Sequence, residues 1–246
     1  MRAIIHKIME RCDLCVVDLD QCIYPRFTQT TLGALLLLSS LKEPYRRFLP
    51  QLLSGAAYIV SIRTARILGK RPTNEELMRA FCRVITGLPL SRVWECSYRL
   101  PGLGPQIWKQ ALNKIGRRMN VFLLTFSIEP VARAYGEVRN AEGERIFRGF
   151  RGTPLRLRGG EIEGCDVAFD GLTPEAKLRA LEEMLQSDGF NHPLIIGHGE
   201  DERLMARRAA EMGGGSIGLA RRGKEVRDFE LVLRGDGWRE IAESLK

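Results

Sequence analysis

The chain has 246 residues, of which 44 % are hydrophobic and 28 % charged, a composition typical of a folded globular protein rather than a disordered or fibrous one. It carries 38 Lys and Arg against 30 Asp and Glu, which gives a formal net charge of +8. The longest apolar run, Leu32 to Leu38, is much shorter than the roughly 20 residues that cross a bilayer, and this excludes a transmembrane helix.

The first half of the chain predicts one buried strand followed by helices. Leu14 to Asp18 is a short apolar run that ends in an acid, as is typical of a buried strand in a parallel sheet. Thr73 is a favourable helix N-cap because acidic residues follow it in the first turn. The segments with apolar residues at helical spacing are 28–69, which Pro44 and Pro50 divide into two or three helices, 73–84 and 107–118.

The second half alternates strands with helices. The predicted strands are 121–125, 167–169, 194–196, 216–219 and 230–233. The predicted helices are 130–135, 174–185 and 202–212. Residues 145–169 are expected to form a hairpin around Gly159 and Gly160. This alternation predicts an α/β fold with a Rossmann-like parallel sheet.

The N-terminal residues and the cysteines indicate the cellular compartment in which the protein is expected. The first residues, MRAIIHKIMERCD, lack both a continuous apolar segment and a small-residue cleavage site, so we expect a cytoplasmic protein. The six cysteines are too sparse for a disulfide scaffold, and no second pair completes a zinc site with Cys12 and Cys15. We expect these two to be small apolar residues beside a buried strand.

The positive charge is concentrated in one segment. Residues 21–120 hold 16 Lys and Arg against 4 Asp and Glu. This imbalance indicates a separate module that contacts an anionic partner, with a solvated arginine-rich surface as the alternative. No nucleic acid is expected as the partner, because the aromatic residues of the segment are dispersed and form no nucleic-acid-binding motif.

Reactive side chains follow the ends of the predicted strands. In parallel sheets, functional groups gather beyond the carboxyl ends of the strands, so these side chains are expected to lie together. In chain order they are Asp18 and Asp20 after the first strand, Thr125 and Ser127 at the second, Lys177 in the first turn of a helix, and the sequence GHGEDE at 197–202 after the third.

This order of motifs resembles the haloacid dehalogenase (HAD) superfamily of phosphatases and phosphotransferases. The matching sequences are DLDQC at 18–22, LLTFS at 123–127, Lys177 and GHGEDE at 197–202. Residues 137–181 are similar to the hairpin and lysine segment of the phosphoserine-phosphatase-like branch. The resemblance covers nearly the whole chain. It implies a core of residues 1–24 and 101–246, with an all-helical cap, 25–100, inserted between the first two motifs.

The resemblance also implies a chemistry, that of a metal-dependent phosphomonoester hydrolase with a small or lipid-like anionic phosphate as substrate. Asp18 would be the nucleophile that forms an aspartyl-phosphate, and Asp20 the general acid and base. Thr125 and Lys177 would bind the phosphoryl group, with Ser127 as a substitute donor for Thr125. The Mg²⁺ ligands would be Asp18, the backbone carbonyl of Asp20, and an acid from the third strand end, Asp201 or Glu202.

One motif departs from the family pattern. His198 stands where the family has its metal-binding Asp, and Glu202 stands where the second Asp falls. A neutral imidazole is a poor ligand for Mg²⁺, so Mn²⁺, Co²⁺ or Zn²⁺ is an open alternative. The alternative function is a weakened or inactive protein that keeps the fold for a binding or scaffold role.

The basic cap leaves a further hypothesis open. Basic residues beside apolar helix faces are typical of peripheral contact with an anionic membrane surface. The residues concerned are Arg46, Arg47, Arg63, Arg66, Lys70 and Arg71. The sequence determines neither the physiological substrate nor the oligomeric state.

Overall fold

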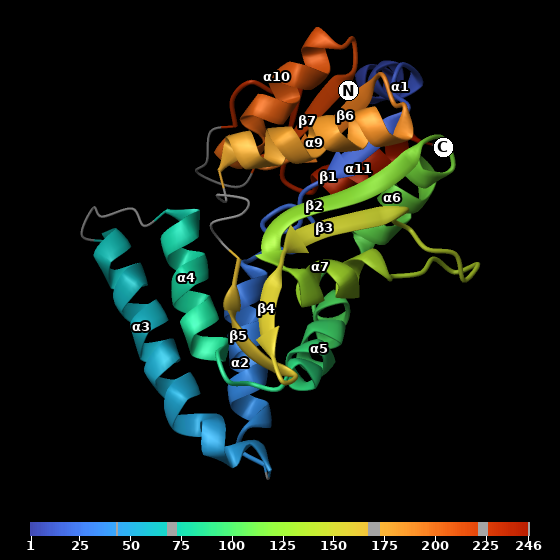
Figure 1. The fold of residues 1–246 in the computed structure, drawn as a ribbon. Helices are drawn as coiled ribbons and strands as arrows, with labels where there is room; N and C mark the ends of the chain where they lie inside the picture. The colour runs from blue at the N-terminus through green and yellow to red at the C-terminus, as the bar shows by residue number, and fades with distance from the viewer. Residues whose placement is uncertain (43, 68–72, 167–172, 221–225, 246) are drawn as a thin grey trace.

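The structure is a computed structural model that describes residues 1–42, 44–67, 73–166, 173–220 and 226–245 (Figure 1). Its centre is a six-stranded sheet in the order β3-β2-β1-β6-β7-β8, and every neighbouring pair is parallel. The strands are β1 (Leu14–Val17), β2 (Asn120–Ile128), β3 (Gly149–Thr153), β6 (Pro193–Gly197), β7 (Gly215–Ala220) and β8 (Leu231–Arg234). The predicted α/β fold with a parallel sheet is confirmed.

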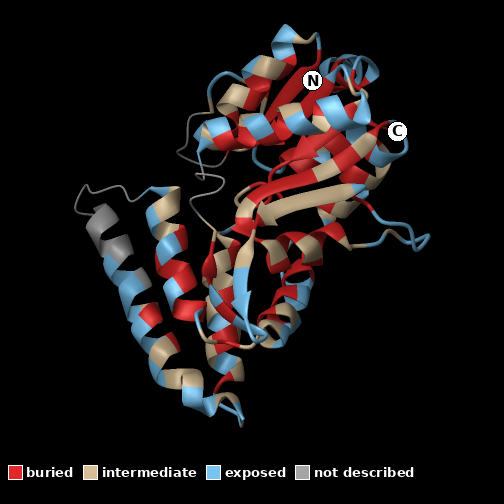
Figure 2. Cartoon of the chain, in the orientation of Figure 1, coloured by how far each residue is buried: buried red, intermediate tan, exposed pale blue. Residues whose placement is uncertain are grey.

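Helices cover both faces of this sheet, and the central strands are buried between them (Figure 2). In β1, Leu14 and Val16 point to one face, whereas Cys15 and Val17 point to the other. Burial on both sides explains why the strand has a continuous apolar sequence. The covering helices are α9 (Pro174–Asp188) and α10 (Arg203–Glu211) on the first face, and α1 (Arg2–Glu10), α6 (Ile107–Gly116) and α11 (Gly237–Ser244) on the second.

A helical insertion separates β1 from β2, as predicted, and lies to one side of the sheet (Figure 1). Its elements are α2 (Thr28–Ser39), η1 (Tyr45–Phe48), α3 (Leu49–Ile67), α4 (Asn74–Ile85), α5 (Leu90–Arg99) and η2 (Leu100–Gly102). Helix α4 begins where the sequence predicts, because Thr73 and Glu76 form a reciprocal capping box. The cap limits 25–100 stay a prediction, since α5 packs on α7 (Glu129–Gly136), which follows β2, as well as on α2.

The hairpin of β4 (Leu155–Arg158) and β5 (Glu161–Cys165) packs on the helical insertion. It turns at Gly159 and Gly160, as predicted, where both residues have positive φ. The backbone of Ile162 donates to Leu88 O at 3.0 Å and accepts from Gly87 N at 2.7 Å. Hairpin and helices therefore form one joined body. The predicted strand 167–169 lies outside the described residues.

A disulfide between Cys82 of α4 and Cys165 of β5 strengthens this junction. The cysteine spacing did not predict it, because the two residues are 83 positions apart and meet only through tertiary packing. Cys12 and Cys15 are free and buried beside or within β1, in agreement with the expectation. Burial raises the pKa of the Cys12 thiol to about 11, so this cysteine is unreactive at neutral pH.

Removing the disulfide is expected to destabilise the oxidised protein. A cross-link over 83 residues restricts the unfolded chain, and we expect Cys82→Ser to lower the free energy of unfolding by about 2–4 kcal/mol. Urea denaturation without reductant measures this loss. Fully reduced wild type should match the variant. Cys96→Ser, which changes a free buried cysteine of α5, should respond to reductant as wild type does. Equal stability of Cys82→Ser and oxidised wild type contradicts the prediction.

The residues behind the membrane hypothesis are only partly described. Arg46 and Arg47 of η1 are exposed. The side chains of Arg63 and Arg66 lie outside the described part of the structure, as do Lys70 and Arg71. Among the described residues, no helix combines the length and apolar character that a membrane span requires. Contact of the cap with a membrane surface stays a prediction.

Candidate active site

The predicted site residues meet at the carboxyl edge of the sheet, as parallel topology requires. Asp18 directly follows β1, and His198 directly follows the neighbouring strand β6. Thr125 lies near the end of β2, on the other side of β1. Helix α9 precedes β6 and runs back along the sheet (Figure 1). Lys177 lies in its first turn and contacts Asp18 at the same edge.

Lys177 lies between two carboxylates. Its Nζ donates to Asp18 Oδ1 at 2.8 Å and to Glu202 Oε1 at 2.5 Å. The three side chains are 2 %, 4 % and 0 % exposed, in the order Lys177, Asp18, Glu202. Buried charges are tolerated when they are paired and hydrogen-bonded, and this arrangement meets that condition. The lysine therefore neutralises part of the charge that the two acids bring to the site.

The charges of this group control its protonation. Burial raises the pKa of the Asp18 carboxyl, but the Lys177 ammonium and His198 outweigh burial and hold that pKa below its usual value. Burial also disfavours the charged lysine, yet Asp18 and Glu202 together raise the pKa of Lys177. For Glu202, burial is the larger effect, and its pKa is raised despite the lysine. Asp18 is thus ionised at neutral pH.

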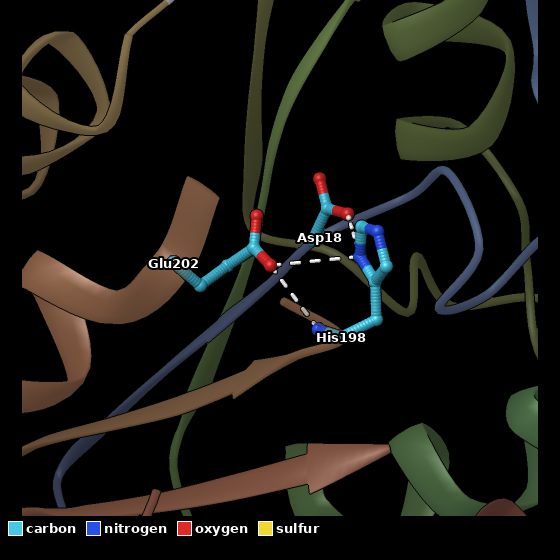
Figure 3. A group of neighbouring side chains, drawn as sticks. All are labelled: Asp18, His198 and Glu202. Carbon is cyan, nitrogen blue, oxygen red and sulfur yellow. Dashed lines mark hydrogen bonds and ion pairs between the residues drawn. The ribbon is translucent and has the colours of Figure 1, made fainter. Parts of the chain in front are cut away.

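His198 lies against both carboxylates (Figure 3). Its Nδ1 is 3.1 Å from Asp18 Oδ2 and 3.5 Å from Glu202 Oε2. Burial lowers the pKa of the imidazole, but the hydrogen bond to Asp18 and the charge of Glu202 outweigh burial and raise it. Glu202 Oε2 also accepts the backbone N–H groups of His198 and Gly199, at 3.1 Å and 3.2 Å.

Gly197 makes room for this arrangement at the end of β6. A Cβ at this position would lie 2.5 Å from Glu202 Cγ, closer than packed carbon atoms approach. Only glycine lets the Glu202 side chain pass the strand end on its way to Lys177 and His198. The glycine of the GHGEDE motif is therefore part of how the acid is placed.

The donor set Asp18, His198 and Glu202 fits a divalent cation. One ligand atom from each residue lies within 4.8 Å of the others. Two carboxylates and an imidazole suit Mn²⁺, Co²⁺ or Zn²⁺ better than Mg²⁺, which prefers oxygen ligands alone. Asp201 is not part of this group, and its Oδ1 accepts from Asn74 Nδ2 of α4 at 3.0 Å.

Both carboxyl oxygens of Asp20 accept hydrogen bonds, and this side chain is not part of the group of Asp18, His198 and Glu202. Oδ1 accepts the backbone N–H of Thr28 at 2.6 Å, and Oδ2 accepts from Ser127 Oγ at 2.8 Å. Burial raises the pKa of Asp20 to about 6; the Thr28 N–H opposes this rise, and the charge of Asp18 adds to it. A carboxyl with such a pKa exchanges protons readily near neutral pH.

Thr125 and Lys177 line one small pocket, together with Arg151. Thr125 Oγ1 accepts the backbone N–H of Ser127 at 3.1 Å, which leaves the hydroxyl proton of Thr125 free for another acceptor. The structure thus places the two predicted phosphoryl-binding residues beside the same space. Ser127, the substitute donor, bonds to Asp20 instead.

A larger pocket, of about 260 Å³, lies between α4 and the hairpin. Its lining combines basic and acidic side chains with the disulfide: Arg79, Arg83, Arg156, Glu163, Asp166, Cys82 and Cys165. It contains none of the predicted site residues, and we therefore do not include it in the candidate site.

The parallel sheet with a helical insertion before β2 is a fold that this chain shares with solved phosphatase structures. Solved structures with this fold include a phosphoserine phosphatase in a phospho-aspartyl intermediate analogue, with a TM-score of 0.61 and 15 % identity, covering 96 % of this chain and 100 % of that one. The phosphoserine phosphatase of T. onnurineus has a TM-score of 0.55 and 14 % identity, over 96 % of this chain and 94 % of that one.

Cytosolic 5′-nucleotidase IIIB bound to cytidine also shares the fold, with a TM-score of 0.64 and 14 % identity, over 99 % of this chain and 89 % of that one. No family model matches the sequence, and no curated protein matches it. The chain therefore shares its fold with these proteins, and its activity has to be argued from its own residues.

Proposed function

We propose that this protein is a metal-dependent phosphomonoester hydrolase that works through an aspartyl-phosphate on Asp18. The observation that carries the proposal is the environment of Asp18, an ionised carboxylate fixed by Lys177 at the edge of the sheet. Asp20 lies two residues further along the chain, with a pKa suited to proton exchange. One of the solved structures with this fold is a phospho-aspartyl analogue, which supports this assignment.

The first step is attack by a carboxylate oxygen of Asp18 on phosphorus. A bond forms between this oxygen and phosphorus, and the ester P–O bond breaks. The leaving oxygen takes the proton of Asp20, so the alcohol departs neutral. Because Asp20 is half-protonated near pH 6, it is able to supply this proton.

The second step is hydrolysis of the aspartyl-phosphate. Asp20, now ionised, takes a proton from water, and the water oxygen attacks phosphorus. The bond between phosphorus and Asp18 breaks, which releases inorganic phosphate and restores both acids. Thr125 donates to a phosphoryl oxygen, and Lys177 offsets negative charge throughout.

A divalent cation would be held by Asp18, His198 and Glu202 and would supply positive charge to the phosphoryl oxygens. The basic segment 21–120 supports an anionic substrate, since it carries 16 Lys and Arg against 4 Asp and Glu. Two of the solved structures that share the fold are a phosphoserine phosphatase and a 5′-nucleotidase. For this chain we propose a small or lipid-like phosphate monoester as the substrate.

The metal requirement tests this proposal. Wild type is expected to hydrolyse an aryl phosphate with Mn²⁺, Co²⁺ or Zn²⁺ better than with Mg²⁺, and to stop when a chelator is added. His198→Asp replaces the nitrogen donor by oxygen and should shift the preference toward Mg²⁺ by about tenfold or more, the size typical of changes around a metal site. Initial rates with each metal measure the shift.

The same experiment tests the alternative function, a binding or scaffold role without turnover. A protein that has lost turnover and keeps a binding role would be inactive with every metal, whereas His198→Asp would regain activity. Unchanged metal preference in His198→Asp, with wild type active, contradicts the placement of His198 among the ligands. Exposed His6, whose Nδ1 lies 3.7 Å from Glu10 Oε1 on α1, offers a matched control as His6→Asp.

A further inference from the structure

Ser127 makes a contact that its predicted role does not require. It lies in β2 and is 0 % exposed, and its hydroxyl donates to Asp20 Oδ2 at 2.8 Å. A serine hydroxyl has one proton, so a Ser127 that donates to Asp20 does not also donate to a phosphoryl oxygen. Its hydroxyl is directed toward the general acid instead.

Thr28 completes the arrangement from the cap side. As the first residue of α2, it donates its backbone N–H to Asp20 Oδ1 at 2.6 Å, and its Oγ1 is 2.5 Å from Ser127 Oγ. A serine hydroxyl has one proton to donate and accepts from a second donor. If Ser127 donates to Asp20, the Thr28 hydroxyl is therefore the group that donates to Ser127.

The two oxygens of Asp20 are thus fixed by donors from different elements, β2 and α2. A carboxyl held at one oxygen still rotates about its own bond, whereas one held at both has a defined orientation. Proton transfer contributes to catalysis only when the acid lies within hydrogen-bond reach of the leaving oxygen. Small displacements of a positioned group lower rates strongly.

We propose that Ser127 is a positioning residue which, together with Thr28, orients the Asp20 carboxyl for proton transfer to the leaving group. This inference rests on the proposed phosphatase function. It assigns Ser127 to the general acid and leaves binding of the phosphoryl group to Thr125 and Lys177.

The dependence of the rate on the leaving group tests the assignment. A nitrophenolate is a stable anion and departs without a proton, but an alkoxide needs one. The parameter compared is kcat/KM, because it reports the steps up to formation of the aspartyl-phosphate and leaves out the later hydrolysis, in which Asp20 acts as a base for both substrates. Ser127→Ala is expected to reduce kcat/KM for an alkyl phosphate such as glycerol 2-phosphate by about 10–100-fold, less than the full contribution of a general acid because Asp20 itself remains. With p-nitrophenyl phosphate, kcat/KM should fall by less than about threefold, because this leaving group needs no proton.

Thr28→Val gives an independent second variant, because it keeps the shape and the backbone N–H but removes the hydroxyl that faces Ser127. Thr28→Val should also lower kcat/KM more for the alkyl phosphate than for p-nitrophenyl phosphate, and by a smaller factor than Ser127→Ala. Ser40→Ala is the matched control. Ser40 is a buried serine at the other end of α2, and its hydroxyl donates to Leu36 O.

Each outcome has a meaning. Equal losses on both substrates in Ser127→Ala and Thr28→Val overturn the inference and leave Ser127 a merely structural residue. The same holds if neither variant changes the ratio of the two rates. If wild type hydrolyses neither substrate with any metal, the proposed function itself fails, and the inference fails with it.

Discussion

Asp18→Asn is expected to abolish phosphate ester hydrolysis, with a loss of at least about a thousandfold, as for other nucleophile replacements. The amide still accepts a hydrogen bond from Lys177, so the site keeps its shape, but it cannot form the acyl phosphate. Turnover of an aryl phosphate in the best metal measures the loss. Mass spectrometry of acid-quenched protein should find a phosphoryl adduct in wild type and none in the variant.

Asp13→Asn is the matched control for this experiment. Asp13 stands one residue before β1 and accepts the backbone N–H groups of Asn191 and His192, so its role is structural. Its loss should affect stability and leave the chemistry in place. Turnover near that of wild type in Asp18→Asn, from protein purified free of other phosphatases, contradicts the nucleophile assignment.

Lys177→Met is expected to remove activity and destabilise the fold together. The substitution keeps an unbranched apolar chain but leaves Asp18 and Glu202 buried without their cation. Breaking a buried ion pair from one side costs about 3–5 kcal/mol. Chemical denaturation of metal-free protein measures the loss, because a bound cation would replace part of the missing charge.

A second substitution separates the charge effect from lost packing. In Lys177→Met/Glu202→Gln one of the two uncompensated acids is gone, so this double variant should be more stable than Lys177→Met and equally inactive. Arg179→Met, an exposed position on the same helix, should leave stability within about 0.5 kcal/mol of wild type. A double variant no more stable than the single one indicates that packing, and not charge, holds Lys177 in place.

The elements that the sequence predicted best are those whose signal is local. β1 is a buried apolar run, and α4 has a capping box followed by amphipathic spacing. Helix α1 is not among the predicted elements, although Ile5, Ile8 and Met9 follow helical spacing. Helices α5 and α11 were not predicted either. Both are short, with 10 and 8 residues, so their apolar faces, Val93 and Cys96 in α5 and Trp238 and Ile241 in α11, give little periodic signal.

For the site, chain order predicted which strand ends meet but not where individual side chains point. Asp201 and Glu202 are adjacent in sequence, yet Glu202 turns inward to Lys177 and Asp201 turns to Asn74 of the cap. The link between Thr28 and Ser127 and the disulfide between Cys82 and Cys165 join residues far apart in the chain. Sequence spacing does not predict such contacts, because they form only when the cap packs against the rest of the chain.

The junction of hairpin and helical insertion limits how the site is able to open. An insertion tethered only by its own two ends is able to swing about them in many directions. Here the hairpin has a separate pair of tethers, after β3 and before α9, and it is joined to α4 by the disulfide and to the α4–α5 loop by backbone hydrogen bonds. A rotation of the insertion relative to the sheet has to be compatible with the chain connections of the insertion and with those of the hairpin. A change in the position of the helical insertion relative to the sheet therefore has to carry the hairpin with it.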